Sequence, residues 1–131
     1  MRIVSLYAAL LAILFVVLSI RTIRMRRSLK IAIGDSGSPA MLRAMRVHSN
    51  FAEYVPLTLL LVALVEVGGV GPWVVHGLGL LLLVGRLSHA YGVSQTKEVF
   101  AFRVAGMAMT FTTIVCASLI LLYEFSWPRV A

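Results

Sequence analysis

The chain has 131 residues, of which 60% are apolar and 13% are charged, with a formal net charge of +7. A soluble domain has about a quarter of its residues charged, so this chain has too few polar side chains to cover a surface in water. The length fits one domain, and the composition excludes an ordinary soluble protein in favour of an integral membrane protein.

Four long apolar runs, separated by turn formers, are the dominant feature of the sequence. A helix needs roughly 20 apolar residues to span a bilayer, and the runs predict membrane helices at about residues 2–27, 39–67, 72–92 and 98–124. The first run meets a group of arginines instead of a small-residue cleavage site, so we interpret it as a retained spanning helix rather than a signal peptide. The sequence therefore predicts an all-α integral membrane four-helix bundle, folded as a single domain over residues 1–131.

Three connections join the predicted helices. Residues 28–38 form the one sizeable loop, and Ser38 followed by Pro39 is typical of an N-cap with proline at the first helical position. Glycines at residues 68–71, followed by Pro72, predict a tight turn between the second and third helices. Residues 92–96 are expected to connect the third helix to the fourth.

Lysine and arginine are distributed unequally between the two ends of the predicted bundle. The end with the first and third connections holds Arg21, Arg24, Arg26, Arg27, Lys30, Arg43, Arg46, Arg86, Lys97 and Arg103. The opposite end holds Arg2 and Arg129. Basic residues beside membrane segments mark the cytoplasmic side and meet anionic lipid headgroups, so both termini are expected to face away from the cytoplasm. A nucleic-acid partner is not expected, because these residues lie beside apolar runs rather than in a solvated groove.

The predicted second helix begins with a polar stripe. Arg43, Arg46, Asn50 and Glu53 are spaced 3, 4 and 3 residues apart, which places them on one side of an α-helix. Such a stripe is costly against lipid, so it should face the bundle interior or a subunit interface. One interpretation is that Arg46 and Glu53 pair with neighbouring helices and only hold the bundle together. The other is a polar pocket for a charged small molecule.

Two further helices place basic residues near this stripe. Arg86 and His89 lie three residues apart near the end of the predicted third helix, and Arg103 lies in the apolar start of the fourth. With Arg46 they would bring guanidinium groups from three helices to one side of the membrane, where they would repel unless an anion lies among them. Glu53, a lipid headgroup or a ligand with carboxylates would each serve. The single cysteine and the histidines lack zinc-ligand spacing, so no metal site is expected.

The stretch from Arg46 to Pro56, RVHSNFAEYVP, carries a motif: an arginine, an asparagine four residues later, and then Glu-Tyr-x-Pro. It resembles the MAPEG family, the membrane-associated proteins in eicosanoid and glutathione metabolism, and especially the bacterial members and the leukotriene C synthase branch. The basic end of the first helix, the long first loop, the GR-x-x-H end of the third helix and the arginine of the fourth follow in the expected order. The resemblance therefore covers nearly the whole chain.

By this resemblance, the chain would be one subunit of a homotrimer in a bacterial inner membrane, with glutathione bound between adjacent subunits near the cytoplasmic side. The resemblance implies that Arg103 activates the glutathione thiol. It also implies glutathione contacts from one arginine at the end of the first helix, Arg24 or Arg26, and from Arg46, His48, Asn50, Glu53, Tyr54 and His89.

The activity implied is that of a membrane-bound transferase or peroxidase, with glutathione as co-substrate and a lipophilic electrophile as the second substrate. The thiolate is the nucleophile, and a free thiol has a pKa of about 8.5, so a nearby cation would make the thiolate abundant at neutral pH. An apolar epoxide, hydroperoxide or halide would reach such a site from the lipid.

Two departures from the family pattern favour an alternative, a non-catalytic membrane scaffold or lipid-binding protein on the same fold. Val93 stands where several members have a tyrosine that helps to bind glutathione, and Arg103 aligns with the family's arginine only after a one-residue shift relative to one branch. A small four-helix multidrug exporter is disfavoured. That class needs a membrane-embedded carboxylate in its first helix, and the first helix here has no acidic residue.

Overall fold

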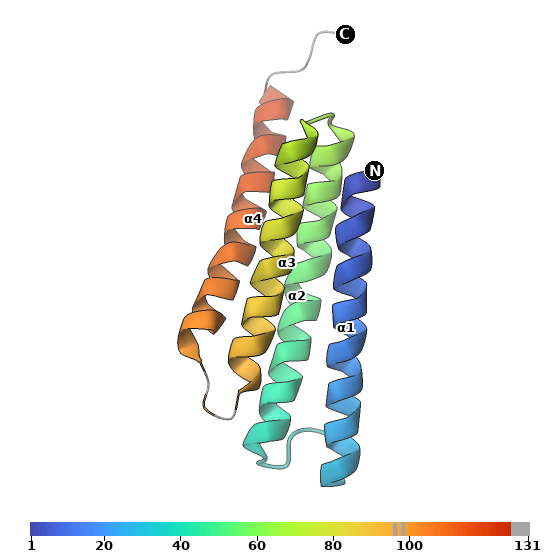
Figure 1. The fold of residues 1–131 in the computed structure, drawn as a ribbon, viewed down its shortest axis with the longest axis vertical. Coiled ribbons are helices and arrows are strands. Elements are labelled where there is room, and N and C mark those ends of the chain that lie inside the picture. The colour runs from blue at the N-terminus through green and yellow to red at the C-terminus, as the bar shows by residue number, and fades with distance from the viewer. Residues whose placement is uncertain (96, 98, 127–131) are drawn as a thin grey trace.

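The computed structural model describes residues 1–95, 97 and 99–126, and its regular structure in that part of the chain is entirely helical. Its helices are α1 (Arg2–Leu29), α2 (Pro39–Val67), α3 (Pro72–Ser94) and α4 (Phe100–Ser126). Each has 23 to 29 residues and is apolar enough to cross a membrane. They lie side by side, each running opposite to the one before it (Figure 1). The predicted all-α four-helix membrane bundle is confirmed.

The helix ends differ from the predicted ones by about two residues. α1 continues to Leu29 and stops where Lys30 adopts a left-handed conformation, with φ of 55°. α3 continues to Ser94, so Gly92 and Val93 are helical rather than part of the connection. Within the described residues α4 begins at Phe100 and ends at Ser126. The predicted start of that helix at residue 98, and residues 96 and 129, lie outside the described residues.

The local signals at the start of α2 and α3 act as the sequence predicts. Ser38 accepts a hydrogen bond from the backbone N–H of Met41, at 3.3 Å, and Pro39 is the first helical residue of α2. Gly69 adopts a φ of 78° in the turn before α3, a left-handed conformation that residues other than glycine rarely adopt. Pro72 then opens α3.

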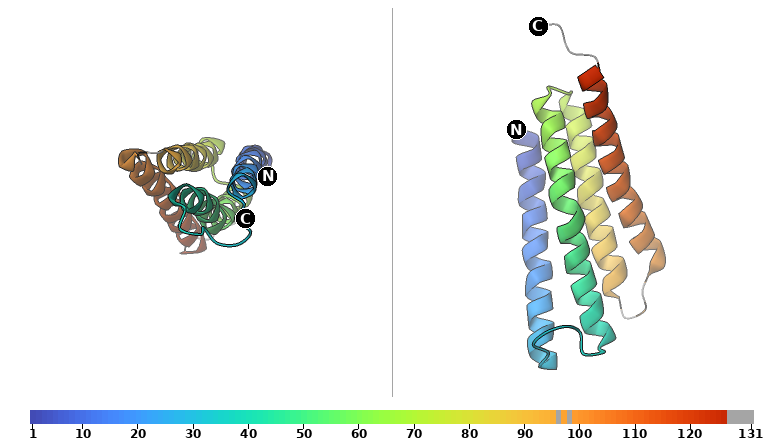
Figure 2. Two further views of the ribbon diagram at one scale, coloured as in Figure 1. Left: turned by 90° about the horizontal axis from the view of Figure 1, so that it is seen from below. Right: turned by 180° about the vertical axis from the view of Figure 1, so that it is seen from behind.

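α2 and α3 form the middle of the bundle, and α1 and α4 lie on either side of this pair. α1 packs on α2 and α3, and α4 packs on α3 and α2, but described residues of α1 and α4 do not contact each other. Figure 1 and the view from behind in Figure 2 show α4 leaning outward at the end where it begins. This end also carries the α1–α2 and α3–α4 connections, and we call it the basic end because it holds most of the arginines.

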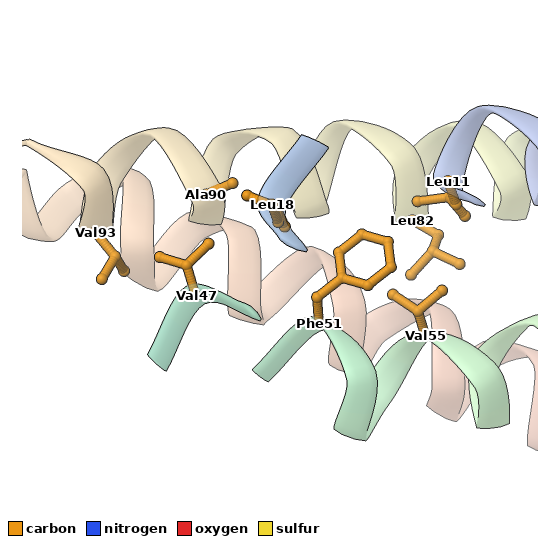
Figure 3. Packing of buried hydrophobic residues seen from close by; sticks show 8 residues of the cluster. All are labelled: Leu11, Leu18, Val47, Phe51, Val55, Leu82, Ala90 and Val93. Atoms are coloured by element: carbon orange, nitrogen blue, oxygen red, sulfur yellow. The ribbon is translucent and has the colours of Figure 1, made fainter. Parts of the chain in front are cut away.

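The core runs along the line where α1, α2 and α3 meet. Figure 3 shows Phe51 of α2 directed toward the side chains contributed by α1 and α3. The members of this cluster are Leu11, Leu18, Val47, Phe51, Val55, Leu82, Ala90 and Val93. A second cluster, of four valines with Leu78 and Ala117, lies nearer the opposite end. The buried side of α2 thus follows Val47, Phe51 and Val55, and its polar stripe faces elsewhere.

Polar contacts fix α1 at the end opposite the basic end. The Glu66 carboxylate accepts the backbone N–H groups of Ile3 and Val4, at 3.0 and 2.9 Å, and lies 3.8 Å from the amino group of Met1. Carboxylates stabilise helix N-termini because the first N–H groups have no partner within the helix. One turn further along, the Tyr7 hydroxyl is 3.1 Å from Nδ1 of His76.

Glycines bring α3 and α4 into close contact. A Cβ atom added at Gly106 would lie 2.5 Å from the carbonyl oxygen of Gly85 and 2.6 Å from the backbone nitrogen of His89. A Cβ atom at Gly92 would lie 2.7 Å from the backbone nitrogen of Arg103. Small residues commonly allow such approach between membrane helices. Gly92 therefore serves packing rather than the turn that the sequence predicts.

Gly106→Ala tests this packing. We expect it to lower the free energy of unfolding by about 1–3 kcal/mol, because the added methyl group must push backbone atoms of α3 away. Gly77→Ala is the matched control, since nothing lies within 4 Å of a Cβ atom there and alanine favours the helix by about 0.5–1 kcal/mol. Thermal unfolding in detergent measures both variants. An equal or higher melting temperature for Gly106→Ala would contradict the proposed contact.

Candidate functional site

A pocket of about 380 Å³ opens at the basic end, between the first turns of α2 and the part of α4 that leans outward. Most of its lining residues come from α2, two buried ones come from α3, and Arg103 comes from α4. The lining residues are Leu42, Arg43, Arg46, Ser49, Asn50, Glu53, His89, Val93 and Arg103. The structure therefore brings together Arg46, Asn50, Glu53, His89 and Arg103 from the set proposed in the sequence analysis.

The polar stripe of α2 forms one wall of this pocket. Arg46 and Glu53 are exposed on the chain's surface, and Asn50 between them is partly buried. Within the described part of the chain, Arg46 and Glu53 form no ion pair with each other or with a neighbouring helix. The interpretation that these two residues hold the bundle together is therefore not supported inside one chain. The stripe faces outward, where a subunit interface or a ligand would cover it.

The pocket is rich in positive charge. Arg43, Arg46 and Arg103 contribute three guanidinium groups, and Glu53 contributes one carboxylate. Guanidinium groups recognise carboxylates through paired hydrogen bonds, and a carboxylate accepts hydrogen bonds from an ammonium group. The arrangement suits a small molecule that carries several carboxylates and one amino group.

Arg86 does not join this surface cluster, contrary to the expectation from sequence. Its side chain is buried, with 1% of its surface exposed, beneath the pocket and between α2, α3 and α4. Its guanidinium carbon lies 5.9 Å from the centre of the Phe51 ring, a distance compatible with a cation–π contact. A guanidinium group has five N–H donors, and burial away from water requires partners for them.

Neutral acceptors on all three helices supply those partners. Nη2 of Arg86 donates to Oδ1 of Asn50 at 2.6 Å and lies 3.1 Å from Nδ1 of His89. Nη1 donates to the Thr110 hydroxyl at 3.3 Å and points at the sulfur of Met107 at 3.8 Å. Nε has no hydrogen-bond partner among the described residues. Two residues that line the pocket, Asn50 and His89, thus form hydrogen bonds to a buried arginine that the sequence analysis grouped with Arg46 and Arg103.

Two of the remaining predicted residues, His48 and Arg26, form contacts with α1 and with the α1–α2 loop. His48 lies 3.0 Å from the Ser19 hydroxyl and stacks on Phe15, with ring centres 4.8 Å apart. Arg26 donates to the carbonyl oxygens of Gly34 and Ala32, at 3.0 and 3.4 Å, and so fastens the α1–α2 loop.

Arg24 and Tyr54 also lie outside the pocket wall of this chain. Arg24 lines a separate groove along α1, together with Arg21. Tyr54 packs edge-on against Phe111 of α4, with ring centres 5.4 Å apart. A ligand held only by one chain would therefore miss Arg24, and it would contact Tyr54 only by extending along α2 beyond Glu53.

Val93 gives the pocket an apolar patch on its α3 side. The residue is buried, belongs to the core cluster shown in Figure 3, and also lines the pocket. Val93, which the resemblance aligns with a tyrosine of several family members, therefore faces this pocket. A hydroxyl group is missing from that wall.

Comparison with known proteins places these features in a family. The sequence profile of the MAPEG family matches residues 4–123, a range that includes every residue lining the pocket. "Inner membrane protein YecN" of Escherichia coli strain K12 is 35% identical to this chain over 126 residues, covering 96% of this chain and 95% of the relative. The YecN protein of Escherichia coli O6:H1 strain CFT073 has the same identity and coverage.

Proposed function

This chain belongs to the MAPEG family, and on that premise we propose that it is a membrane-bound, glutathione-dependent transferase or peroxidase acting on lipophilic electrophiles. The observation that carries this proposal is the pocket between α2, α3 and α4. It gathers Arg46, Asn50, Glu53, His89 and Arg103 from three helices at the basic end.

The charges of the pocket complement those of glutathione. The tripeptide carries two carboxylates, one ammonium group and a thiol. Arg43, Arg46 and Arg103 match the carboxylates and the thiolate, and Glu53 matches the ammonium group. Because Arg46 and Glu53 are exposed on a membrane helix and unpaired within the described chain, a ligand that pairs both would remove a large electrostatic cost.

A homotrimer would complete the site. α1 and α4 each keep an outer face that no other described helix of this chain covers, so both are available to neighbouring subunits. The polar stripe of α2 faces outward and needs such a cover. In this arrangement Arg24 or Arg26 reaches glutathione from an adjacent subunit. Within one chain Arg26 lines a second cavity, of about 580 Å³, together with Arg46 and His48. His48 and Tyr54 then border the site rather than form its centre.

The chemistry we propose is attack by the glutathione thiolate. Arg103 favours the thiolate over the thiol, as a close cation does. In the transferase reaction, the sulfur bonds to the electrophilic carbon and the bond from that carbon to a halide or an epoxide oxygen breaks. The thiol proton leaves to solvent, and an opened epoxide takes up a proton. In the peroxidase reaction, the sulfur attacks the hydroperoxide, the O–O bond breaks, and a second glutathione yields the disulfide, an alcohol and water.

A non-catalytic scaffold or lipid-binding protein is the second candidate, and Val93 favours it. The α3 wall of the pocket has an isopropyl group and no hydroxyl group at this position, so one hydrogen bond to the thiol or its neighbours is lost. In that case the arginines of the basic end would bind lipid headgroups.

We infer that the basic end faces the cytoplasm, so that both termini face away from it. A reporter enzyme that is active only outside the cytoplasm should therefore be active when fused after the last residue. The same reporter inserted in the α1–α2 loop, near Gly34, should be inactive. The reverse pattern in bacterial cells would overturn this orientation.

Glutathione binding to the detergent-purified protein, measured by calorimetry, is the direct test of the proposal. We expect saturable binding, which Arg46→Ala weakens by about tenfold to a hundredfold through loss of a charge-assisted hydrogen bond. Arg27→Ala is the matched control, because this exposed arginine of α1 lies outside the pocket. No binding at millimolar glutathione would favour the scaffold, and an equal effect of both substitutions would reject the pocket.

Arg103→Ala separates binding from thiol activation. We expect the conjugation rate with an aryl halide to fall by about tenfold or more at neutral pH, because less of the bound glutathione is thiolate. Raising the pH should recover part of the rate, and Arg103→Lys should keep more activity than Arg103→Ala. Stopped-flow absorbance of the thiolate, with size-exclusion chromatography as a folding control, measures this. Unchanged turnover at neutral pH would exclude the activating role.

A further inference from the structure

We propose that Arg86 is a positioning residue, which makes Asn50 present a hydrogen-bond donor to the pocket and fixes the tautomer of His89. The ligand named for this pocket rests on the proposed function above. The orientation of the two side chains rests only on the contacts of Arg86.

The first step concerns the amide of Asn50. Arginine is a donor at every polar hydrogen and never an acceptor, so the atom 2.6 Å from Nη2 of Arg86 must be the amide oxygen of Asn50. The NH₂ group of the same amide is then directed away from Arg86. Asn50 is partly buried and lines the pocket, so the pocket receives a donor from this residue.

The second step concerns the imidazole of His89. Its Nδ1 lies 3.1 Å from the same Nη2 atom, so Nδ1 must accept this hydrogen bond. An imidazole that accepts at Nδ1 is neutral and carries its proton on Nε2. A charged imidazole is excluded by this contact, because its second N–H group, at Nδ1, would point at the N–H groups of Arg86. One NH₂ group of Arg86 thereby sets the amide orientation of Asn50 and the tautomer of His89.

The third step concerns how the side chain of Arg86 is itself held in place. It is 1% exposed, and Nη1 is tied to the Thr110 hydroxyl, which donates to the backbone carbonyl of Gly106 at 2.9 Å. The contact between Gly85 and Gly106 holds α3 and α4 at this spacing. The network therefore spans α4, α3 and α2 and ends at Asn50 and His89, which line the pocket.

The consequence is a pocket dominated by donors. Guanidinium groups and the amide of Asn50 donate, and the Glu53 carboxylate is the charged acceptor among the described residues that line the pocket. Such a pocket selects an acceptor-rich anion. It should bind glutathione with free carboxylates and reject the glutathione diester, which has the same thiol and lacks both negative charges.

The tautomer of His89 in the ligand-free protein tests the positioning role of Arg86, because a purely structural role of Arg86 would not fix this tautomer. The chain has three histidines, and ¹⁵N NMR of the ring nitrogens distinguishes the tautomers, with His89→Phe assigning the signal. We expect His89 to be neutral at pH 7 and protonated on Nε2, and we expect Arg86→Met to give a mixture of tautomers. A native His89 that is charged or protonated on Nδ1 would overturn the proposal.

Asn50→Asp tests the donor role without removing the contact to Arg86. A carboxylate still accepts from Nη2, so the melting temperature should equal or exceed that of the native protein. Its other oxygen is an acceptor facing the pocket, so glutathione affinity should fall by about tenfold or more. Arg86→Met should also weaken binding, and Arg86→Lys, which keeps an N–H donor, should recover part of it. Native-like affinity in Asn50→Asp would overturn the proposal.

These measurements distinguish a failure of the inference from a failure of the proposed function. If native protein does not bind glutathione, the proposed function fails, while the His89 tautomer still decides the role of Arg86. If native protein binds glutathione and its diester equally, the donor-dominated pocket is rejected and glutathione binding stands.

Discussion

A buried guanidinium group is the constraint on which the rest of this structure depends. In a membrane bundle no water is available to solvate Arg86, so acceptors must come from the helices around it. α2 supplies Asn50, α3 supplies His89, and α4 supplies Thr110. These contacts require α3 and α4 to approach closely, which Gly106 permits. The fold and the candidate site are therefore coupled: the network that satisfies one buried charge also fixes two side chains of the pocket.

The two ends of the bundle are built differently, and the difference leaves the site open. At one end Glu66 satisfies the first N–H groups of α1, and Tyr7 meets His76, so polar groups are paired within the chain. At the basic end Arg46 and Glu53 have no such partners among the described residues, and α4 leans away from α2 (Figure 1). Internal pairing stabilises a single subunit, whereas outward, unpaired charge favours binding of a ligand or a neighbouring subunit.

The sequence predicts the parts of this molecule that depend on local pattern. Apolar runs locate the four helices, Ser38 and Pro39 locate the start of α2, and the 3-4-3 spacing places the polar stripe on one wall. Such local patterns do not predict which side chains meet between helices. An arginine near a helix end can reach the headgroups or turn inward, and the direction taken by Arg86 depends on Thr110, which is 24 residues away. For the same reason the pairing of His48 with Ser19, 29 residues away, has no signal in the α2 motif.

Val93 determines which polar groups remain in the pocket to stabilise a negative charge. A tyrosine at this position would place a hydroxyl group on the α3 wall, and the valine instead joins the core cluster of Phe51 and Val47. In the proposed reaction, thiolate stabilisation would then come from Arg103 and from the Asn50 amide that Arg86 holds. Preorganised donors cost no reorganisation when charge develops, so a fixed Asn50 amide would replace part of what the hydroxyl group would supply. In the proposed reaction, the contacts of the buried arginine would therefore make up in part for the absent tyrosine hydroxyl group.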